Sequence, residues 1–166
     1  RFLKWEYINF NDRIINIPAA ELKNNKSLDV PLAYQAIEIL EDMKAVTGDK
    51  EYVFVTSRGK DTPLSENTTT RAIQRLINPV TGKPFGSGFM TSHGFRHTAS
   101  TMLNELNYHS DIIELQLAHT NKDGIRATYN KAQWMEKRID MMQSWADYLD
   151  GLKSQGNVTP INKKVI

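Results

Sequence analysis

Apolar residues near the start of the chain occur in short runs rich in β-branched side chains. Residues 13–19 (RIINIPA) and 26–32 (KSLDVPL) are two such runs, and the polar stretch 20–26 (AELKNNK) separates them. This arrangement predicts a β-hairpin, because polar connections between β-branched runs are typical of hairpin turns. Residues 51–56 (EYVFVT) predict a further short, buried strand.

Beyond the hairpin, apolar positions recur mainly at helical spacing. Residues 33–46 predict a helix, with the glycine at position 48 as a stop signal. Residues 64–77 predict a second helix, for which Ser65 or Asn67 is the expected N-cap. The positions of this second helix expected to face inward are Ala72, Ile73, Leu76 and Ile77. Residues 78–90 contain two prolines and three glycines, which predicts a loop.

The second half of the chain is predicted to be helical throughout. Residues 93–106 form the expected third helix, with Ser92 as its N-cap. Its expected core positions are Phe95, Ala99, Met102, Leu103 and Leu106. Residues 110–119 predict a short helix capped by Ser110 or Asp111.

Two further helices are expected near the end, the first of them a short one around residues 126–129. The second, residues 131–152, is strongly amphipathic and is expected to end at Gly151. Its expected inward positions are Trp134, Ile139, Met142, Trp145 and Leu149. The polar residues 153–166 are expected to form a tail.

These elements predict an α+β fold that is mostly helical. A small N-terminal antiparallel hairpin or sheet would pack against a helical bundle, in one domain of residues 1–152. A chain of 166 residues is long enough to bury such a core.

Composition and charge narrow the function classes. The chain has no cysteine, which excludes disulfides and thiol catalysis, and no apolar run approaches the roughly 20 residues that span a membrane. The net charge is only +2, yet residues 58–98 hold six Lys or Arg against two acids. Within this stretch Arg71 and Arg75 share a helical face. A local basic excess of this kind is typical of a phosphate-binding surface, although an uneven solvated surface is an alternative explanation.

The stretch 90–103 (MTSHGFRHTASTML) carries the first candidate chemistry. His93 and Arg96 are three residues apart at a predicted helix start, so both side chains can reach one anion. An arginine fork binds two phosphate oxygens, and the helix N-terminus adds to the attraction. A zinc site on His93 and His97 is the alternative, but Gly94 stands where a metalloprotease has its glutamate. A capped helix with a surface arginine is a second alternative, and the role of His97 stays open.

Two residues downstream complete a possible catalytic set. His119 follows the fourth predicted helix, and Tyr129 lies ten residues later. Taken singly, they would be a helix-capping histidine and a half-buried aromatic. Cationic groups converging on a phosphate can instead make a tyrosine an effective nucleophile, because they stabilise the phenolate and the transition state together.

The ordered motifs SHGFRHT, LAH and RATYNKA resemble the catalytic domain of tyrosine recombinases, most closely phage and prophage integrases. The closing MMQSWADYLDGL resembles the C-terminal helix of the satellite-prophage integrase branch. The resemblance covers essentially the whole chain.

The resemblance implies a role for each matching residue. Tyr129 would attack a DNA phosphate to form a 3′-phosphotyrosyl link, with Arg96, His93 and His119 around the same phosphate. The family's catalytic lysine lies in a hairpin turn, where Lys23 is the best match and Lys26 a weaker one. A lysine there could protonate the leaving 5′-oxygen, which is worth roughly two to four orders of magnitude in rate.

The same resemblance implies the partners. The expected partner is double-stranded DNA at attachment sites, gripped through its backbone by basic residues that include Arg71, Arg75, Lys26 and Lys83. A homotetramer on paired sites, a bacterial cytoplasmic location, and no metal or other cofactor are also expected.

One departure concerns the family's first catalytic arginine. That residue lies in a helix-rich segment just before the region matched by residues 2–5 (FLKW), which is expected to be a strand. Arg1 is too close to this strand to be that arginine. We therefore expect an N-terminally truncated catalytic domain that lacks this arginine and the preceding DNA-binding domain. Loss of one preorganised charge costs about 3 kcal/mol or more, so impaired activity is expected.

Two other functions remain possible from the residues alone. The chain could be a DNA-binding regulator that keeps the recombinase fold and cleaves no strand, or a metal-dependent hydrolase. Covalent adduct formation with DNA separates the first from a recombinase, and sensitivity to chelators identifies the second. We also expect Arg96→Ala to abolish adduct formation and to leave folding intact, since Arg96 should face the phosphate.

Overall fold

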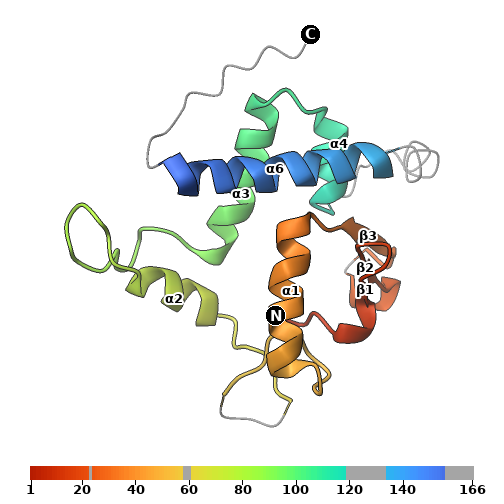
Figure 1. Ribbon diagram of the computed structural model, residues 1–166, viewed down its shortest axis with the longest axis horizontal. Helices are drawn as coiled ribbons and strands as arrows, with labels where there is room; N and C mark the ends of the chain where they lie inside the picture. The colour runs from red at the N-terminus through yellow and green to blue at the C-terminus, as the bar shows by residue number, and fades with distance from the viewer. Residues whose placement is uncertain (23, 58–60, 119–133, 156–166) are drawn as a thin grey trace.

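The computed structural model describes residues 1–22, 24–57, 61–118 and 134–155, and Figure 1 gives the element labels. Within these residues the chain follows an α+β order, in agreement with the prediction. The elements in chain order are η1 (Trp5–Tyr7), β1 (Ile8–Asn9), β2 (Ile14–Ile17), η2 (Ala19–Glu21), β3 (Leu28–Pro31), α1 (Tyr34–Thr47), α2 (Thr68–Arg75), α3 (Ser92–Glu105), α4 (Ser110–Gln116) and α6 (Met135–Gln155).

The sheet is antiparallel with strand order β1-β2-β3. Ile15 of β2 lies between Ile8 of β1 and Val30 of β3, so the predicted hairpin is confirmed. In the connection between β2 and β3, Asn25 has a φ of 54°, a left-handed conformation that asparagine tolerates better than most residues.

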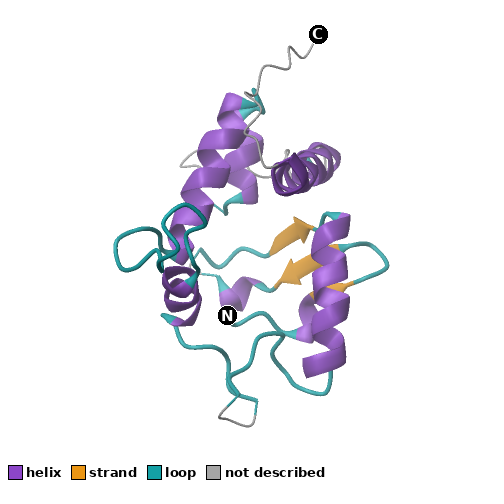
Figure 2. Ribbon diagram, turned by 60° about the vertical axis from the view of Figure 1, so that its left-hand side comes forward, coloured by secondary structure: helices purple, strands orange, loops and turns teal. Residues whose placement is uncertain are grey.

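The first core lies between the sheet and α1, which runs alongside it in Figure 2. Its fully or almost fully buried side chains are Ile8, Leu40 and Val53. The indole Nε1 of Trp5 donates to the carbonyl oxygen of Thr47 at 2.7 Å, which ties η1 to the end of α1. Helix α1 ends just before the predicted glycine stop.

The second core lies among α3, α4 and α6, where α6 crosses the other two helices (Figure 1). Leu103, Ile112, Ile113 and Met141 are its buried members. None of the helices in the described part of the chain is long and apolar enough to cross a membrane. The predicted packing of a small sheet against helices is therefore realised as two adjoining cores.

Polar contacts join the two cores. Gln143 of α6 accepts a hydrogen bond from the backbone N–H of Tyr34 at the start of α1. Gln35 of α1 donates in turn to the carboxylates of Asp147 and Asp150 on α6. The long helix α6 thus holds the sheet and α1 against the other helices.

The strands predicted at residues 2–5 and 51–56 are wrong. These segments meet only at an isolated bridge between Lys4 and Tyr52, and Val55 forms another with Pro63. Proline has no N–H, so it cannot donate to extend the second pairing into a ladder. The backbone of residues 51–56 forms hydrogen bonds with residues 3–5 on one side and with residues 62–64 on the other, so neither pairing is long enough for a strand. Val53 is nevertheless fully buried, as expected.

Helix α2 is shorter than predicted, and two of its expected core residues are exposed. It ends at Arg75, and Leu76 and Ile77 are 58% and 57% exposed. The N–H of Phe85 donates to the carbonyl of Leu76, which closes a loop instead of a further helical turn. Leu76 itself has an extended backbone with a ψ of 138°, so the helix stops one residue before the two apolar positions that were expected to face inward. Ala72 is also exposed, so only Ile73 of the four expected core positions is buried.

The predicted N-caps of α3 and α4 are wrong by one or two positions. Thr91 is the N-cap of α3 and Ser92 its first residue. His109 caps α4, where its Nδ1 accepts from the N–H of Asp111 at 3.2 Å. Helix α4 also ends at Gln116, three residues earlier than expected. Both helices otherwise begin close to where the sequence places them.

The apolar faces of α3 and α6 also differ in part from the prediction. Phe95 is 53% exposed, while Leu103 is buried as expected. In α6, Ile139 and Leu149 are partly exposed, whereas Met141 is fully buried. The helix continues through Gly151 to Gln155, because a glycine in a helix weakens it without ending it. The helix expected at 126–129 lies outside the described residues.

Candidate phosphate-binding site at the start of helix α3

The first turn of α3 carries the predicted histidine and arginine. His93 is exposed and Arg96 is half-buried, and they lie three residues apart along the helix. The ring of His97 stands edge-on to that of His93, with centroids 4.6 Å apart. Both imidazoles are exposed, so the start of α3 presents two neighbouring histidine rings to solvent.

Arg96 also binds the end of α4. Its Nη2 donates to the carbonyl oxygen of Leu117, the C-cap residue of that helix. The next residue, Ala118, has a φ of 54°, so the chain leaves the helix in a left-handed conformation. One guanidinium thus fixes where the chain exits α4, two positions before His119.

Helix α2 is held against the same turn of α3 by a side chain that the sequence did not single out. Thr70 accepts a hydrogen bond from the backbone N–H of Ser92 at 3.2 Å, and the two hydroxyls lie 3.3 Å apart. This bond satisfies one of the N–H groups that every helix start leaves unpaired. Arg71, which follows Thr70, and Arg75 are exposed on α2. Two predicted DNA-contacting arginines therefore belong to a helix anchored at the candidate site.

The two predicted DNA-contacting lysines are also exposed. Lys26 follows the β2–β3 turn, where its backbone N–H donates to Oδ1 of Asn24 at 3.2 Å. Lys83 lies in the loop after α2, where its carbonyl accepts from the N–H of Asn78. Neither lysine is shown in contact with the first turn of α3.

Three predicted catalytic residues, Lys23, His119 and Tyr129, lie outside the described residues. The structure therefore brings together only part of the predicted set, namely His93 and Arg96 with the helix that carries Arg71 and Arg75. In the described ranges, no three histidine, aspartate or glutamate side chains gather in a way that could hold a metal ion.

A buried arginine that the sequence analysis passed over lies at the junction of the two cores. Arg138 of α6 is only 2% exposed. Its Nε donates to Oε1 of Gln116 at 2.9 Å, and its Nη2 donates to the carbonyl oxygen of Asp29 at 2.6 Å. Its spacing could have revealed it, because it lies four residues after Trp134 and three before Met141 on the apolar face.

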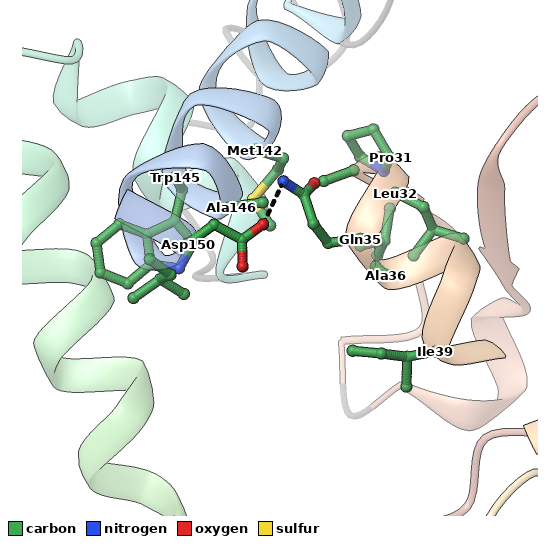
Figure 3. A pocket seen from close by; sticks show the side chains of 12 residues that line it. Pro31, Leu32, Gln35, Ala36, Ile39, Met142, Trp145, Ala146 and Asp150 are labelled. Atoms are coloured by element: carbon green, nitrogen blue, oxygen red, sulfur yellow. Dashed lines mark hydrogen bonds between the residues drawn. The ribbon is translucent and has the colours of Figure 1, made fainter. Parts of the chain in front are cut away.

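An apolar groove of about 340 Å³ separates α1 from α6 (Figure 3). Leu32 and Ile39 line one side and Met142 and Trp145 the other. The hydrogen bond from Gln35 to Asp150 spans the groove at 3.0 Å. The charged residue among those that line the groove is Asp150, which would repel a phosphate, so the groove does not suit this ligand.

Comparison with known proteins agrees with the resemblance. Residues 1–135 match the model of the phage integrase family. The integrase of Shigella phage Sf6 and the prophage integrase IntS of Escherichia coli K12 are each 38% identical over 151 residues, which is 90% of this chain and 37% of each relative.

A third relative, the prophage integrase IntZ of Escherichia coli K12, is 39% identical over 162 residues, which is 97% of this chain and 38% of the relative. The chain thus spans little more than a third of the length of these relatives. No solved structure matches it significantly. The family match covers most of the chain, including the first turn of α3 and the end of α4, and the chain belongs to the phage integrase family.

Proposed function

We propose that this chain carries the catalytic site of a site-specific recombinase that cleaves and rejoins DNA at attachment sites, with Tyr129 as nucleophile. The observation that carries the proposal is the first turn of α3. There an exposed histidine and a half-buried arginine lie beside the end of α4, in a chain of the phage integrase family. A helix N-terminus with an arginine fork is well suited to a phosphate. The catalytic domain would comprise residues 1–152.

The proposed cleavage step balances without a cofactor. The phenol of Tyr129 gives its proton to His93, and its oxygen forms a bond to phosphorus. The bond from phosphorus to the 5′-oxygen breaks, and Lys23 supplies the proton that the leaving oxygen needs. Arg96 and His119 stabilise the charge on the phosphate oxygens. Attack of a 5′-hydroxyl on the phosphotyrosine reverses these events and rejoins a strand.

Exposed basic residues provide the proposed grip on the DNA backbone. Arg71 and Arg75 lie on the helix anchored to α3, and Lys26 and Lys83 are exposed elsewhere. Cations that neutralise phosphates release counterions, so binding should weaken as salt rises. Assembly as a homotetramer on paired sites is supported by the family resemblance alone.

Tyr129→Phe tests the proposal in the complete gene product that contains this chain. The substrate is an attachment-site duplex with a nick, from which the cleaved fragment diffuses away and traps the covalent intermediate. We expect an adduct on a denaturing gel with the parent protein and none with Tyr129→Phe, because phenylalanine has no oxygen to attack. Tyr34→Phe, which removes an exposed hydroxyl from α1, is the matched control.

The outcomes separate the candidate functions. An adduct that persists in Tyr129→Phe assigns the nucleophile to another residue. DNA binding by the parent protein without any adduct would favour a regulator that cleaves no strand. Strand cleavage that a chelator abolishes would favour the metal-dependent hydrolase.

A further inference from the structure

Burial of the charged side chain of Arg138 costs desolvation free energy. It is 2% exposed, and no carboxylate of the described residues lies within ion-pair distance of its guanidinium. Burial lowers the pKa of Arg138, and the nearby charge of Asp29 only partly offsets this effect. An apolar side chain of similar size could fill such a position without desolvating a charge. The position therefore calls for an explanation beyond packing.

The contacts of Arg138 join three separate elements. From α6 it reaches Gln116 in the last turn of α4 and the carbonyl of Asp29 in β3. A guanidinium can do this because its N–H donors diverge in a rigid plane, whereas a lysine ammonium is a point charge on a flexible stem. Arg138 thus acts as a bracket between the sheet and the two helices.

Each end of this bracket lies close in sequence to a proposed catalytic residue. Asp29 follows Lys23 by six positions, and Gln116 precedes His119 by three. Arg138 itself follows Tyr129 by nine. The bond to Asp29 is a direct link between α6 and the strand that follows the lysine-bearing turn.

We propose that Arg138 is a positioning residue that holds the β2–β3 hairpin, and with it the general-acid lysine, in register with α4 and α6. This inference rests on the proposed function and deepens it. Among the described residues, the side chain of Arg138 donates to Gln116 and to the carbonyl of Asp29, and we assign its effect to the second of these bonds. Loss of Arg138 should therefore harm protonation of the leaving 5′-oxygen more than attack on phosphorus.

The first test measures the bracket without relying on activity. Hydrogen–deuterium exchange of residues 14–31 is followed in the complete gene product and in Arg138→Met. We expect faster exchange in the hairpin, because its anchor to α6 is gone. Lys137→Met, which removes an exposed positive charge from the next position of α6, is the matched control. Unchanged hairpin exchange in Arg138→Met, or an equal rise in the control, would overturn the proposal.

The second test compares two leaving groups at the cleavage point. One substrate has the natural 5′-oxygen and the other a bridging sulfur, which departs as a weakly basic thiolate and needs no proton. We expect Arg138→Met to cleave the oxygen substrate about 100-fold more slowly than the parent protein, a loss typical of an absent general acid. The sulfur substrate should be cleaved at a rate within about threefold of the parent's. An equal loss on both substrates would mean a merely structural role and overturn the proposal, as would unchanged cleavage of both.

A milder variant keeps the test decisive if Arg138→Met fails to fold. Gln116→Leu removes only the α4 end of the bracket. We expect this variant, too, to lose more cleavage rate on the oxygen substrate than on the sulfur substrate, but with a smaller loss on the oxygen substrate than in Arg138→Met. Equal rates on the two substrates relative to the parent would again overturn the proposal. Failure of the parent protein to cleave either substrate would refute the proposed function instead, while hairpin exchange would still decide whether Arg138 acts as a bracket.

Discussion

At the scale of single residues, Arg96 combines two tasks in one guanidinium. An arginine has five N–H donors, and one of those on Arg96 is engaged by the carbonyl oxygen of Leu117. This bond orients the guanidinium and holds the end of α4. In the proposed mechanism, other donors of the same group bind the scissile phosphate. The expectation that Arg96 serves the phosphate alone is therefore incomplete.

Arg96→Ala should lower both activity and stability. We expect adduct formation to fall at least about 100-fold, because a preorganised charge at the transition state is lost. We also expect the free energy of unfolding to fall by about 1–3 kcal/mol, because the Leu117 carbonyl loses a charged donor. Adduct yield on a nicked substrate and urea denaturation measure the two effects. Normal adduct formation would refute the phosphate role, and unchanged stability would refute the contribution of the Leu117 bond.

At the scale of elements, α2 is a short helix that depends on its neighbour. Half of its eight residues are exposed, and Ile73 is its one buried side chain. The bond from the N–H of Ser92 to Thr70 is a specific link to α3. Since helices this short are marginal in water, such links should matter for where α2 and its two arginines lie.

Thr70→Val tests this link with little change in side-chain shape. Valine lacks the hydroxyl oxygen, so the N–H of Ser92 loses its acceptor, and we expect a loss of about 1 kcal/mol in stability, as for a removed helix cap. Thr69→Val, at the exposed preceding position of the same helix, is the control. Chemical denaturation of both variants measures the difference. Equal effects of the two substitutions would show that the bond to Ser92 does not hold α2 to α3.

The secondary-structure elements were predictable from the sequence only in part. Helical spacing and β-branched runs predicted the hairpin and the long helices, because those elements are determined by their own periodicity. Segment 51–56 has the composition of a strand, but Pro63 and the turn after Lys4 leave it no continuous partner. Pairing partners are a tertiary property, so composition alone could not reveal their absence.

Individual positions of the site were predictable to a different degree. His93 and Arg96 followed from a motif, and the structure places them together on an exposed turn. Phe95 was expected in the core and is half exposed, because the packed face of α3 begins further along the helix. Arg138 was missed because its partners, Gln116 and the Asp29 carbonyl, come from distant parts of the chain.

At the scale of the whole molecule, the two cores meet through polar contacts centred on α6. Near its start Arg138 reaches β3 and α4, while Gln143 and Asp147, about one and a half and two and a half turns later, reach α1. An interface held by hydrogen bonds depends on the protonation state of its members. The relative placement of the hairpin and the helices should therefore depend on pH.

Asp147 should make the contact between α1 and α6 weaker as the pH falls. Its carboxylate accepts from Gln35 at 2.9 Å and from Gln143 at 2.8 Å, and these bonds hold its pKa below the usual value. A carboxyl whose pKa is lowered on folding stabilises the fold above its unfolded pKa of about 3.9, and this contribution is lost as pH falls through the lowered pKa. Asp147→Asn should thus be less stable than the parent protein near pH 7.

Urea denaturation between pH 7 and pH 3 measures the effect. We expect the stability gap between the parent protein and Asp147→Asn to narrow as the pH falls, because the parent's carboxylate becomes protonated and donates where it had accepted. Asp140→Asn, exposed two turns earlier on the same helix, is the matched control. A gap of constant size across this range would mean that the charge of Asp147 does not stabilise the contact between α1 and α6. The two cores would then be joined chiefly by Arg138 and by apolar packing.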